Sequence, residues 1–490
     1  MSRDPMRPPP LDVDVLVVGA GLSGIDMACR LATERPELTW AVLEARSATG
    51  GTWDLFRYPG IRSDSDMYTL GFPFRPWRGR TSIAPASEIL QYLRDTADEY
   101  GVTGRTHLGQ RVTRLEWSSA EERWTVTARR DDGEVLEHTA RFVHLATGYY
   151  SYEAGHVVDF PGRASFAGDV VHPQHWPEGT SVAGRRVVLI GSGATAVTLV
   201  PALVDAGAAS VTMLQRSPSY VAALANTDRV ADVARRVLPP RAAHHLVRGK
   251  NVALATATYQ FLRRWPDAGR RVLRRRLLER LPEGYDVDTH FNPAYDPWDQ
   301  RVCLAPDGDL LDAIAGGGAE VVTATIDRFV PEGVRLGDGR VLPADLVVTA
   351  TGLRLEIGGG AALAVDGHAV SVPAHHVYKG CMLSGVPNLF LSVGYTNASW
   401  TLRADLTARW VCHLLGHLDR RGLGVATPRW DGTGGADRPL LDLTSGYVRR
   451  GAHLLPHQAE RRPWRVVQSY LYDVAVTRFG RLEDGVLELR

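Results

Sequence analysis

A short apolar strand that runs directly into a glycine-rich turn and a helix restricts the fold of this chain more than any other feature. Residues 13–18, VDVLVV, are apolar and largely β-branched, which predicts a buried strand. The turn GAGLSG follows at once, with Gly19, Gly21 and Gly24 in the spacing GxGxxG, and a helical pattern continues through IDMACRLATE. This order of strand, turn and helix predicts one half of a Rossmann-like fold.

Each glycine of this turn has its own physical role. Gly19 permits the tight turn, Gly21 lets the backbone approach a pyrophosphate, and Gly24 allows the helix to pack closely on the strand. A second strand pattern, LTWAVLEA, brings Glu44 twenty residues after Gly24, where an acid binds a ribose hydroxyl in this motif. A glycine turn alone would be compatible with a plain tight turn, so the prediction of dinucleotide binding depends on all these parts together.

The same pattern occurs a second time in the middle of the chain. Residues 187–190, VVLI, are followed by GSGATA, in which Gly191 and Gly193 keep the first two positions and Ala196 takes the third. Alanine is allowed at that third position. The sequence therefore predicts two dinucleotide-binding units in one chain.

The two units differ in the residues that follow their second strands. The strand pattern VTMLQRSPSY contains Gln215, Arg216 and Ser217 at the point where Glu44 stands in the first unit. A carboxylate would repel a 2′-phosphate, whereas a guanidinium pairs with it through charge-assisted hydrogen bonds. This difference favours FAD in the first unit and NADPH in the second, although Arg216 could also be a solvated charge at a strand end.

Two further apolar strands end in the same three residues. Residues 142–150, FVHLATGYY, and residues 345–353, DLVVTATGL, both leave the strand through Ala-Thr-Gly. We interpret each as a point where the chain passes from one nucleotide domain to the other. The alternative is two unrelated buried strands.

Composition excludes several other classes of protein. The formal net charge of +1 gives no long-range field for nucleic acid, and the four cysteines show no CxxC spacing. Residues 1–10, MSRDPMRPPP, lack the apolar run of a signal peptide, and no apolar stretch is long enough to span a bilayer. We expect a cytoplasmic multidomain protein without a metal site.

The segment 166–177, FAGDVVHPQHWP, contains two histidines at a spacing that could bind a metal on a helix. His172 and His175 are three residues apart, but Pro173 lies between them and disfavours helix at the preceding residue. This conflict favours a role other than metal binding. The segment fits the fingerprint FxGxxxHxxxW(P/D), in which it supplies Phe166, Gly168, His172, Trp176 and Pro177.

With this fingerprint between two glycine motifs, the chain resembles the class B flavoprotein monooxygenases of the Baeyer–Villiger type. The resemblance covers nearly the whole chain, including residues 50–72, 295–310 and 378–406. The resemblance implies an α/β fold with two Rossmann-like domains for FAD and NADP and an inserted helical subdomain. The expected order is an FAD domain (1–148), an NADP domain (149–224), the helical insertion (225–298), a second NADP part (299–352) and a C-terminal FAD part (353–490).

The reaction that the resemblance implies is the insertion of one oxygen atom from O2 through a C4a-peroxyflavin formed after NADPH reduces FAD. Ketones would become esters or lactones, and thioethers or thioamides would be sulfoxidised as a secondary activity. The alternative within the family is an S/N-oxygenating or hydroxylating flavin monooxygenase with little ketone activity. A disulfide reductase would need a redox pair that the cysteines do not provide, and a nucleotide sensor without enzymatic activity would bind FAD but not oxidise NADPH.

The resemblance also assigns roles to individual residues. It places the catalytic function on Arg301, a fixed cation that stabilises negative charge, with Asp64 holding it. The alternatives are a structural ion pair for Arg301 and a turn residue for Asp64. Many relatives carry lysine where this chain has Gln300, which weakens the expected contact to the 2′-phosphate. The expected cofactor-binding residues are Gly19, Gly21, Ser23, Gly24, Glu44, Thr52, Trp53, Asp54, Leu55, Arg62, Ser63, Asp64, Val112, Gly191, Ser192, Gly193, Ala194, Thr195, Ala196, Val197, Gln215 and Arg216.

Two helical patterns lie outside the nucleotide units. In residues 270–286, Leu273, Leu277 and Leu281 are four apart with arginines around them. This pattern predicts a helical subdomain with a solvated basic face, or alternatively a helix that associates with anionic membranes or a partner subunit. A long helix near residues 396–420 is expected to begin at caps offered by Asn397 and Ser399 and to point its N-terminus at the flavin.

Overall fold

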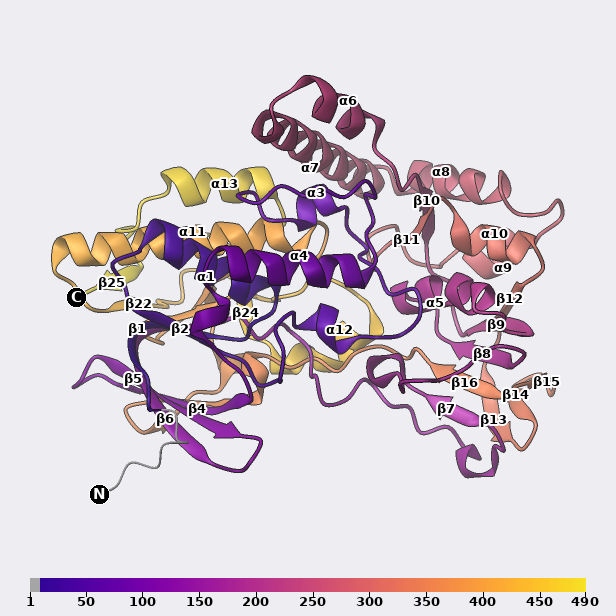
Figure 1. Cartoon of the computed structure of the whole chain (residues 1–490), viewed down its shortest axis with the longest axis horizontal. Helices are drawn as coiled ribbons and strands as arrows, with labels where there is room; N and C mark the ends of the chain where they lie inside the picture. Colours follow the sequence, from indigo (N-terminus) through magenta and orange to yellow (C-terminus); the bar gives the residue numbers. More distant parts are fainter. Residues whose placement is uncertain (1–8) are drawn as a thin grey trace.

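The computed structural model describes residues 9–490 and has two lobes, each built on a parallel sheet (Figure 1). Residues 1–8, which belong to the segment without a signal-peptide pattern, lie outside the described part. The parallel strands of the first lobe run in the order β3-β2-β1-β6-β21. Their bounds are β1 (Asp12–Val18), β2 (Trp40–Leu43), β3 (Thr106–His107), β6 (Val135–Leu145) and β21 (Leu389–Leu391).

The second lobe repeats this plan with a sheet in the order β12-β9-β8-β16-β7, in which every pair is parallel. Each lobe also carries an antiparallel group, β4-β5-β6 in the first and β13-β14-β15 in the second. The α/β class with two Rossmann-like domains is therefore confirmed. The bounds are β7 (Asp169–Val171), β8 (Arg186–Ile190), β9 (Ser210–Gln215), β12 (Ala319–Thr323), β16 (Leu346–Thr349), β4 (Gln110–Ser118), β5 (Arg123–Arg130), β13 (Ile326–Val330), β14 (Gly333–Leu336) and β15 (Val341–Pro343).

Helices cover these sheets (Figure 1), and the short strands either extend the first sheet or form separate two-stranded sheets. The helices are α1 (Leu22–Glu34), α2 (Thr52–Leu55), α3 (Met67–Leu70), α4 (Ala86–Glu99), α5 (Ala194–Asp205), α6 (Arg229–Val237), α7 (Pro240–Arg264), α8 (Pro266–Leu278), α9 (Val287–Phe291), α10 (Asp309–Ala315), α11 (Trp400–Arg421), α12 (Gly446–Gly451) and α13 (Tyr470–Phe479). The remaining strands are β10 (Val221–Leu224), β11 (Cys303–Pro306), β17 (Ala362–Val365), β18 (His368–Ala369), β19 (Val377–Tyr378), β20 (Met382–Leu383), β22 (Ala426–Pro428), β23 (Asp437–Pro439), β24 (His457–Ala459) and β25 (Leu487–Leu489).

The glycine turns of the two lobes are built in the same way. Gly19 has φ +103°, and a Cβ there would lie 2.6 Å from the carbonyl oxygen of Ala146. Gly191 has φ +144°, and a Cβ there would lie 2.4 Å from the carbonyl oxygen of Ala350. Each turn thus presses on the Ala-Thr-Gly exit of the neighbouring strand. In the first turn a Cβ on Gly24 would lie 1.8 Å from the oxygen of Gly19, so its third position requires glycine, whereas the second turn carries Ala196 there.

The chain crosses between the lobes twice, and the two crossings run side by side. After β6 it continues into the second lobe, and after β16 it returns to the first sheet at β17. Tyr150 forms an antiparallel bridge with Leu355, and the N–H of Ser151 donates to the oxygen of Arg354. The Ala-Thr-Gly exits therefore mark, as we expected, the points where the chain passes from one lobe to the other, whereas the exact domain bounds stay a prediction. The pairing of the two crossings was not predicted.

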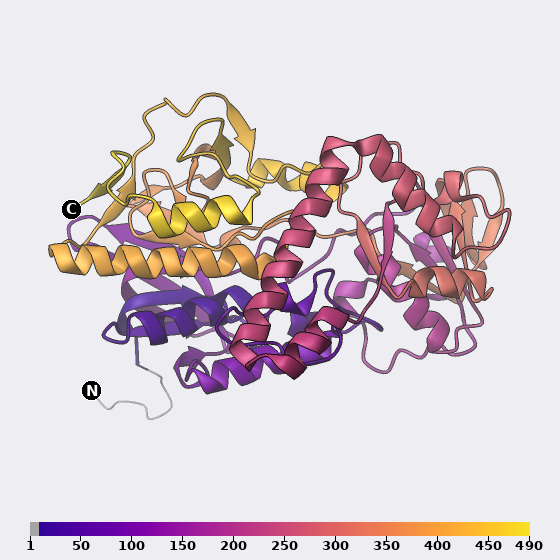
Figure 2. The ribbon, with the colours of Figure 1, turned by 90° about the horizontal axis from the view of Figure 1, so that it is seen from above.

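The helical insertion lies on one side of both lobes, where α7 runs from α3 toward α8 (Figure 2). Leu273, Leu277 and Leu281 are all buried, and α8 ends at Leu278, before the last of them. The three leucines therefore do not form an exposed interfacial face, because Leu277 and Leu281 pack into the core of the second lobe and Leu273 packs in a small separate cluster with Tyr220 and Leu262. Association of the basic face with a membrane or a partner subunit stays a prediction. Within residues 9–490, no helix is long and apolar enough to cross a bilayer.

The long helix α11 begins at Trp400, but the expected capping is wrong. Ser399 holds the cap position without a side-chain bond to the helix, because its Oγ instead shares a hydrogen bond of 2.7 Å with Thr69 Oγ1. Asn397 donates its side-chain N–H to the oxygen of Gln468. Both polar groups therefore fix α11 to neighbouring segments and leave the N–H groups of its first turn without a side-chain cap.

Candidate functional site

The first glycine turn presents an open helix N-terminus. No side chain caps α1 at Gly21, so the first N–H groups of the helix are available to an anion. Gly21 and Gly51 approach closely: a Cβ on Gly51 would lie 2.8 Å from the Cα of Gly21. Beside this turn, Ser23 Oγ accepts a hydrogen bond of 2.8 Å from Trp400 Nε1.

Glu44 lies directly after β2, where it is 6 % exposed. Its carboxylate accepts hydrogen bonds from the backbone N–H groups of Ala20 (2.7 Å) and Arg46 (2.9 Å). Burial raises the pKa of Glu44 despite these bonds, which favour the charged form. The acid is thus held rigidly against the first turn, as a ribose-binding residue requires.

The segment 52–55 supplies both polar contacts and packing. Thr52 Oγ1 lies 2.6 Å from the hydroxyl of Tyr150, and Trp53 packs on the core of the first lobe. Asp54 is buried, and its carboxylate accepts hydrogen bonds from Arg46 and Arg94. The Asp54 side chain therefore joins three segments of the first lobe, which leaves only its backbone for a cofactor.

Two other expected cofactor residues on this side lie at different depths. Leu55 ends α2 and is half-buried, whereas Val112 is 6 % exposed in β4. Val112 is paired with Ala128 just before a register shift in the ladder. This irregularity is consistent with the main-chain contact to an adenine that was expected of Val112.

The second glycine turn is more open than the first. Gly193 and Ala194 are exposed, and no side chain caps α5. Ser192 Oγ donates to the oxygen of Ser217 at 3.0 Å, which fixes the turn to the end of β9, and Thr195 is half-buried. The side chains of Ala196 and Val197 are buried in the core of the second lobe.

At the end of β9, two adjacent residues that were expected to bind the cofactor lie in different environments. Gln215 is buried, and its amide donates to the oxygen of His290 and to Thr323 Oγ1. Arg216 is exposed and has no carboxylate within 4.0 Å among residues 9–490. Of the two, only Arg216 offers free donors to a ligand.

A second unpaired arginine, Arg450 of α12, lies near Arg216 and was not predicted. Burial lowers the pKa of Arg450, and the positive charge of Arg216 lowers it further. Its Nη2 lies close to Gly352 at the exit of β16: a Cβ added to Gly352 would be 3.7 Å from it. Arg450 also lacks a carboxylate partner in the described part of the chain. No local pattern marks it, because it comes from a short helix almost a hundred residues after β16.

Arg301 and Asp64 form an ion pair between the lobes. Arg301 Nη1 donates to Asp64 Oδ2 at 2.7 Å, although the residues are 237 positions apart. Burial lowers the pKa of Arg301, but the charge of Asp64 and the phenols of Tyr149 and Tyr447 outweigh it and raise the pKa above its usual value. The guanidinium of Arg301 therefore stays protonated. Its side chain is 35 % exposed, so solvent screens its charge only in part.

Arg301 also has an unused donor. Its Nε is buried and has no hydrogen-bond partner within residues 9–490. A buried donor without an acceptor is costly, so this atom indicates that a ligand completes the site. Nearby, Arg62 pairs with Asp309 and leaves its Nη2 equally unpartnered, while the buried Ser63 accepts from the N–H of Ser65.

Aromatic residues that follow β6 connect the ion pair with the first turn. Tyr149 stacks on Trp400, with ring centroids 5.2 Å apart and an interplanar angle of 19°. Burial raises the pKa of Tyr149, and the nearby Tyr447 raises it further, so this phenol stays neutral. Sequence reasoning missed Tyr149 and Tyr447, although the position of Tyr149 directly after Ala-Thr-Gly was a usable signal.

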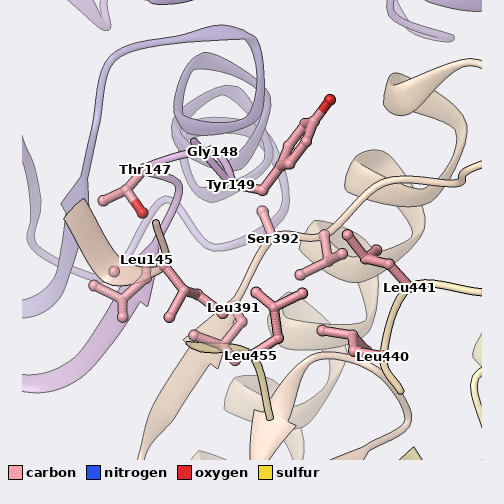
Figure 3. A pocket seen from close by; sticks show the side chains of 12 residues that line it. Leu145, Thr147, Gly148, Tyr149, Leu391, Ser392, Leu440, Leu441 and Leu455 are labelled. Carbon is pink, nitrogen blue, oxygen red and sulfur yellow. The ribbon is translucent and has the colours of Figure 1, made fainter. Parts of the chain in front are cut away.

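A small apolar cavity lies behind Tyr149, at the exits of β6 and β21 (Figure 3). Leu391, Leu440, Leu441 and Leu455 converge on it, whereas the Tyr149 ring points away (Figure 3). Its volume of about 10 Å³ is room for a single water at most. It is a packing defect rather than a substrate pocket.

The fingerprint segment 166–177 is part of the second sheet. Phe166 packs edge-on against Phe329, with centroids 5.9 Å apart, and residues 169–171 form the edge strand β7 beside β16. His172 Nδ1 accepts a hydrogen bond from the N–H of Gln174. The ring packs directly on Gly155, where an added Cβ would lie 2.0 Å from Cε1 of His172. Burial lowers the pKa of His172, so the ring is neutral.

The neighbours of His172 fix the segment to the crossing. Gln174 is buried and donates to the oxygen of Ser151 at 2.8 Å, and His175 Nε2 lies 2.9 Å from the oxygen of Glu153. His175 thus belongs to a 3₁₀ turn rather than a free loop. Within residues 9–490, no three His, Cys, Asp or Glu side chains are placed to bind a metal ion.

Comparison with protein families and curated proteins gives matches over most of the chain. A flavin-binding monooxygenase-like family matches residues 72–233, and an NAD(P)-binding Rossmann-like domain matches residues 17–78. The FAD-containing monooxygenase EthA of Mycobacterium tuberculosis is 48 % identical over 472 residues, which cover 96 % of both chains. EthA of Mycolicibacterium smegmatis is 47 % identical and covers 97 % of this chain and 96 % of its own.

Solved structures show the same fold. A steroid monooxygenase bound to NADP superposes with a TM-score of 0.77 at 22 % identity and covers 98 % of this chain and 99 % of its own. A cyclohexanone monooxygenase with bound ε-caprolactone superposes with a TM-score of 0.76 at 22 % identity and covers 98 % of this chain and 100 % of its own.

Proposed function

The chain belongs to the family of FAD-containing monooxygenases, and we propose that it uses NADPH and O2 to oxidise ketones to esters or lactones. Sulfoxidation of thioethers or thioamides would be a secondary activity. Membership of the family confirms the resemblance and makes the chain a flavin-dependent enzyme. What we propose beyond family membership is that the substrates are ketones.

The observation that carries the proposal is the ion pair of Arg301 and Asp64, in which Nη1 and Oδ2 lie 2.7 Å apart and the Nε of Arg301 has no partner. Oxygen transfer to a carbonyl develops negative charge, and a fixed guanidinium stabilises such charge without losing its own proton. Asp64 orients Arg301 from the first lobe, so the cation is in place only when the lobes are together.

The two uncapped helices fit the cofactors that the family name and the sequence indicate. The start of α1, with Gly21, Ser23 and Glu44, would hold the pyrophosphate and ribose of FAD. The start of α5 and the free Arg216 would hold NADPH. FAD, when bound and reduced by NADPH, supplies the activated oxygen; the protein binds both nucleotides and positions Arg301.

The experiment that tests this function is a product assay. The purified flavoprotein is incubated with NADPH and O2, with phenylacetone and a thioether as substrates, and products are identified by mass spectrometry. We expect benzyl acetate from the ketone and a smaller yield of sulfoxide. Sulfoxide alone would instead support the S/N-oxygenating alternative, and NADPH oxidation with neither product would contradict both.

Because His172 and Gln174 join the edge of the second sheet to the crossing, we expect His172→Ala to uncouple NADPH oxidation from oxygenation. The loss of the ring leaves a void against Gly155, so the crossing is held less firmly and the fraction of NADPH that yields product falls severalfold. The measurement is product formed per NADPH consumed. Replacement of His368, an exposed histidine at the edge of the first sheet, is the control, and unchanged coupling in His172→Ala would contradict the role.

A further inference from the structure

A cavity of about 210 Å³ lies between α11 and α13, and none of its lining residues belongs to the nucleotide site. Its walls come from α11, α13, the loop at 379–381, residues 462–465 and residues 480–484. In Figure 1, α13 lies over α11 at the edge of the first lobe, away from the second lobe. The cavity is therefore a separate feature of the molecule.

The charge of this cavity is strongly positive. It is lined by two carboxylates, Asp473 and Asp484, and by five cations, which are Lys379, Arg403, Arg462, Arg465 and Arg481. Lys379 pairs with Asp484 at 3.2 Å, and Arg403 Nη1 lies 3.6 Å from Asp473. The other three arginines have no carboxylate within 4.0 Å among residues 9–490.

Arg403 is the buried member of this group. The residue is 5 % exposed, and its Nη1 has no hydrogen-bond partner in the part of the chain that the structure describes. Asp473 is too far away to accept this bond and already accepts from the hydroxyl of Tyr395 at 2.6 Å. Arg403 thus has an ion-pair partner but no hydrogen-bond acceptor for Nη1, in a cavity with excess positive charge.

The helix that covers the cavity is loosely packed. No residue of α13 is fully buried, and Leu471, Ala475 and Phe479 form its exposed face at intervals of four residues. Leu471 is 64 % exposed and Phe479 is 82 % exposed. Exposed apolar side chains of this kind beside a basic cavity are able to insert at a lipid surface.

We propose that the cavity between α11 and α13 binds a phosphate group, either of a free phosphate compound or of an anionic lipid headgroup. Arginines present planar, fixed donors that match phosphate oxygens, and several arginines around one anion are the usual arrangement for phosphate recognition. Arg403 supplies the buried donor, and Arg465 and Arg481 supply charge at the mouth. The apolar walls from Leu406, Trp410 and Val476 would contact the remainder of the ligand.

The first test uses a soluble probe. The FAD-loaded enzyme, with its coenzyme site filled by saturating NADP⁺, is titrated calorimetrically with inorganic pyrophosphate at constant ionic strength. We expect binding that becomes at least tenfold weaker in Arg465→Ser and in Arg481→Ser. Arg478→Ser is the control, because Arg478 is an exposed arginine of α13, the helix that covers the cavity, but does not line the cavity.

The second test distinguishes the sources of the phosphate. The same proteins are sedimented with vesicles of phosphatidylglycerol or of neutral phosphatidylcholine. Binding to the anionic vesicles that is lost in Arg465→Ser and in Phe479→Ser but kept in Arg478→Ser identifies a lipid headgroup. Pyrophosphate binding without vesicle binding identifies a free phosphate compound.

The proposal is overturned if neither probe binds, or if Arg478→Ser weakens binding as much as the cavity variants do. Thermal unfolding of each variant without ligand checks that the fold is intact. Because neither NADPH oxidation nor oxygenated product is measured, the result does not depend on the proposed reaction.

Discussion

Replacement of Arg301 by alanine is expected to lower ester formation at least about a hundredfold, the usual cost of removing one donor that stabilises developing charge. Reduction of the flavin by NADPH should change little, because Arg301 is not among the groups proposed to bind the pyrophosphates. The measurement is the rate of ester formation beside the anaerobic rate of flavin bleaching, both followed in the same preparation.

Two further variants separate the charge of Arg301 from its placement. Arg301→Lys keeps the charge but loses the fork of donors, so we expect an intermediate loss. Asp64→Asn keeps the size of the side chain but removes the carboxylate that accepts from Nη1 at 2.7 Å, so Arg301 should be less well oriented. Ester formation that survives in Arg301→Ala at the level of the unaltered enzyme would contradict the assignment.

The parts of this fold that sequence predicted correctly are set by local chemistry. Gly19, Gly24 and Gly191 occupy positions where any Cβ would collide with backbone, so their spacing specifies the turn without knowledge of distant residues. Apolar strands with small-residue exits were equally informative, because the turns pack on them. These features identify two nucleotide domains before any long-range contact is known.

Other expectations failed because distant contacts decided them. The spacing of Leu273, Leu277 and Leu281 could not distinguish a buried face from one turned to a membrane, and the structure buries all three. Ser399 had the right type and position for a cap, but Thr69, 330 residues earlier, takes its hydroxyl. Pattern predicts which side chains are able to interact, whereas tertiary packing selects the partner.

The candidate site shows the same division. Arg301 and Asp64 were paired only through family resemblance, since a separation of 237 residues leaves no local signal. Gln215 and Arg216 were predicted together, but β9 directs the amide of Gln215 inward and leaves Arg216 exposed. Arg450 escaped prediction altogether because it is brought to the second lobe by the C-terminal part of the chain.

The pair of Arg216 and Arg450 leads to the second large expected effect. We expect Arg450→Ala to raise the KM for NADPH about 10- to 100-fold, since a hydrogen bond to a charged group contributes about 1.5–3 kcal/mol. The KM for NADH should stay unchanged, because NADH lacks the 2′-phosphate. Arg450 would thereby take the place of the lysine that relatives carry where this chain has Gln300.

The matched control is Arg449→Ala, which removes an exposed arginine adjacent to Arg450 in α12. If both arginines hold one phosphate, the double variant of Arg216 and Arg450 should lose less than the product of the two single losses, because groups that share a ligand are not additive. Equal losses with NADPH and NADH would place Arg450 at the pyrophosphate instead. A loss in Arg449→Ala as large as in Arg450→Ala would mean that the overall charge of α12, and not a specific contact of Arg450, determines the binding of NADPH.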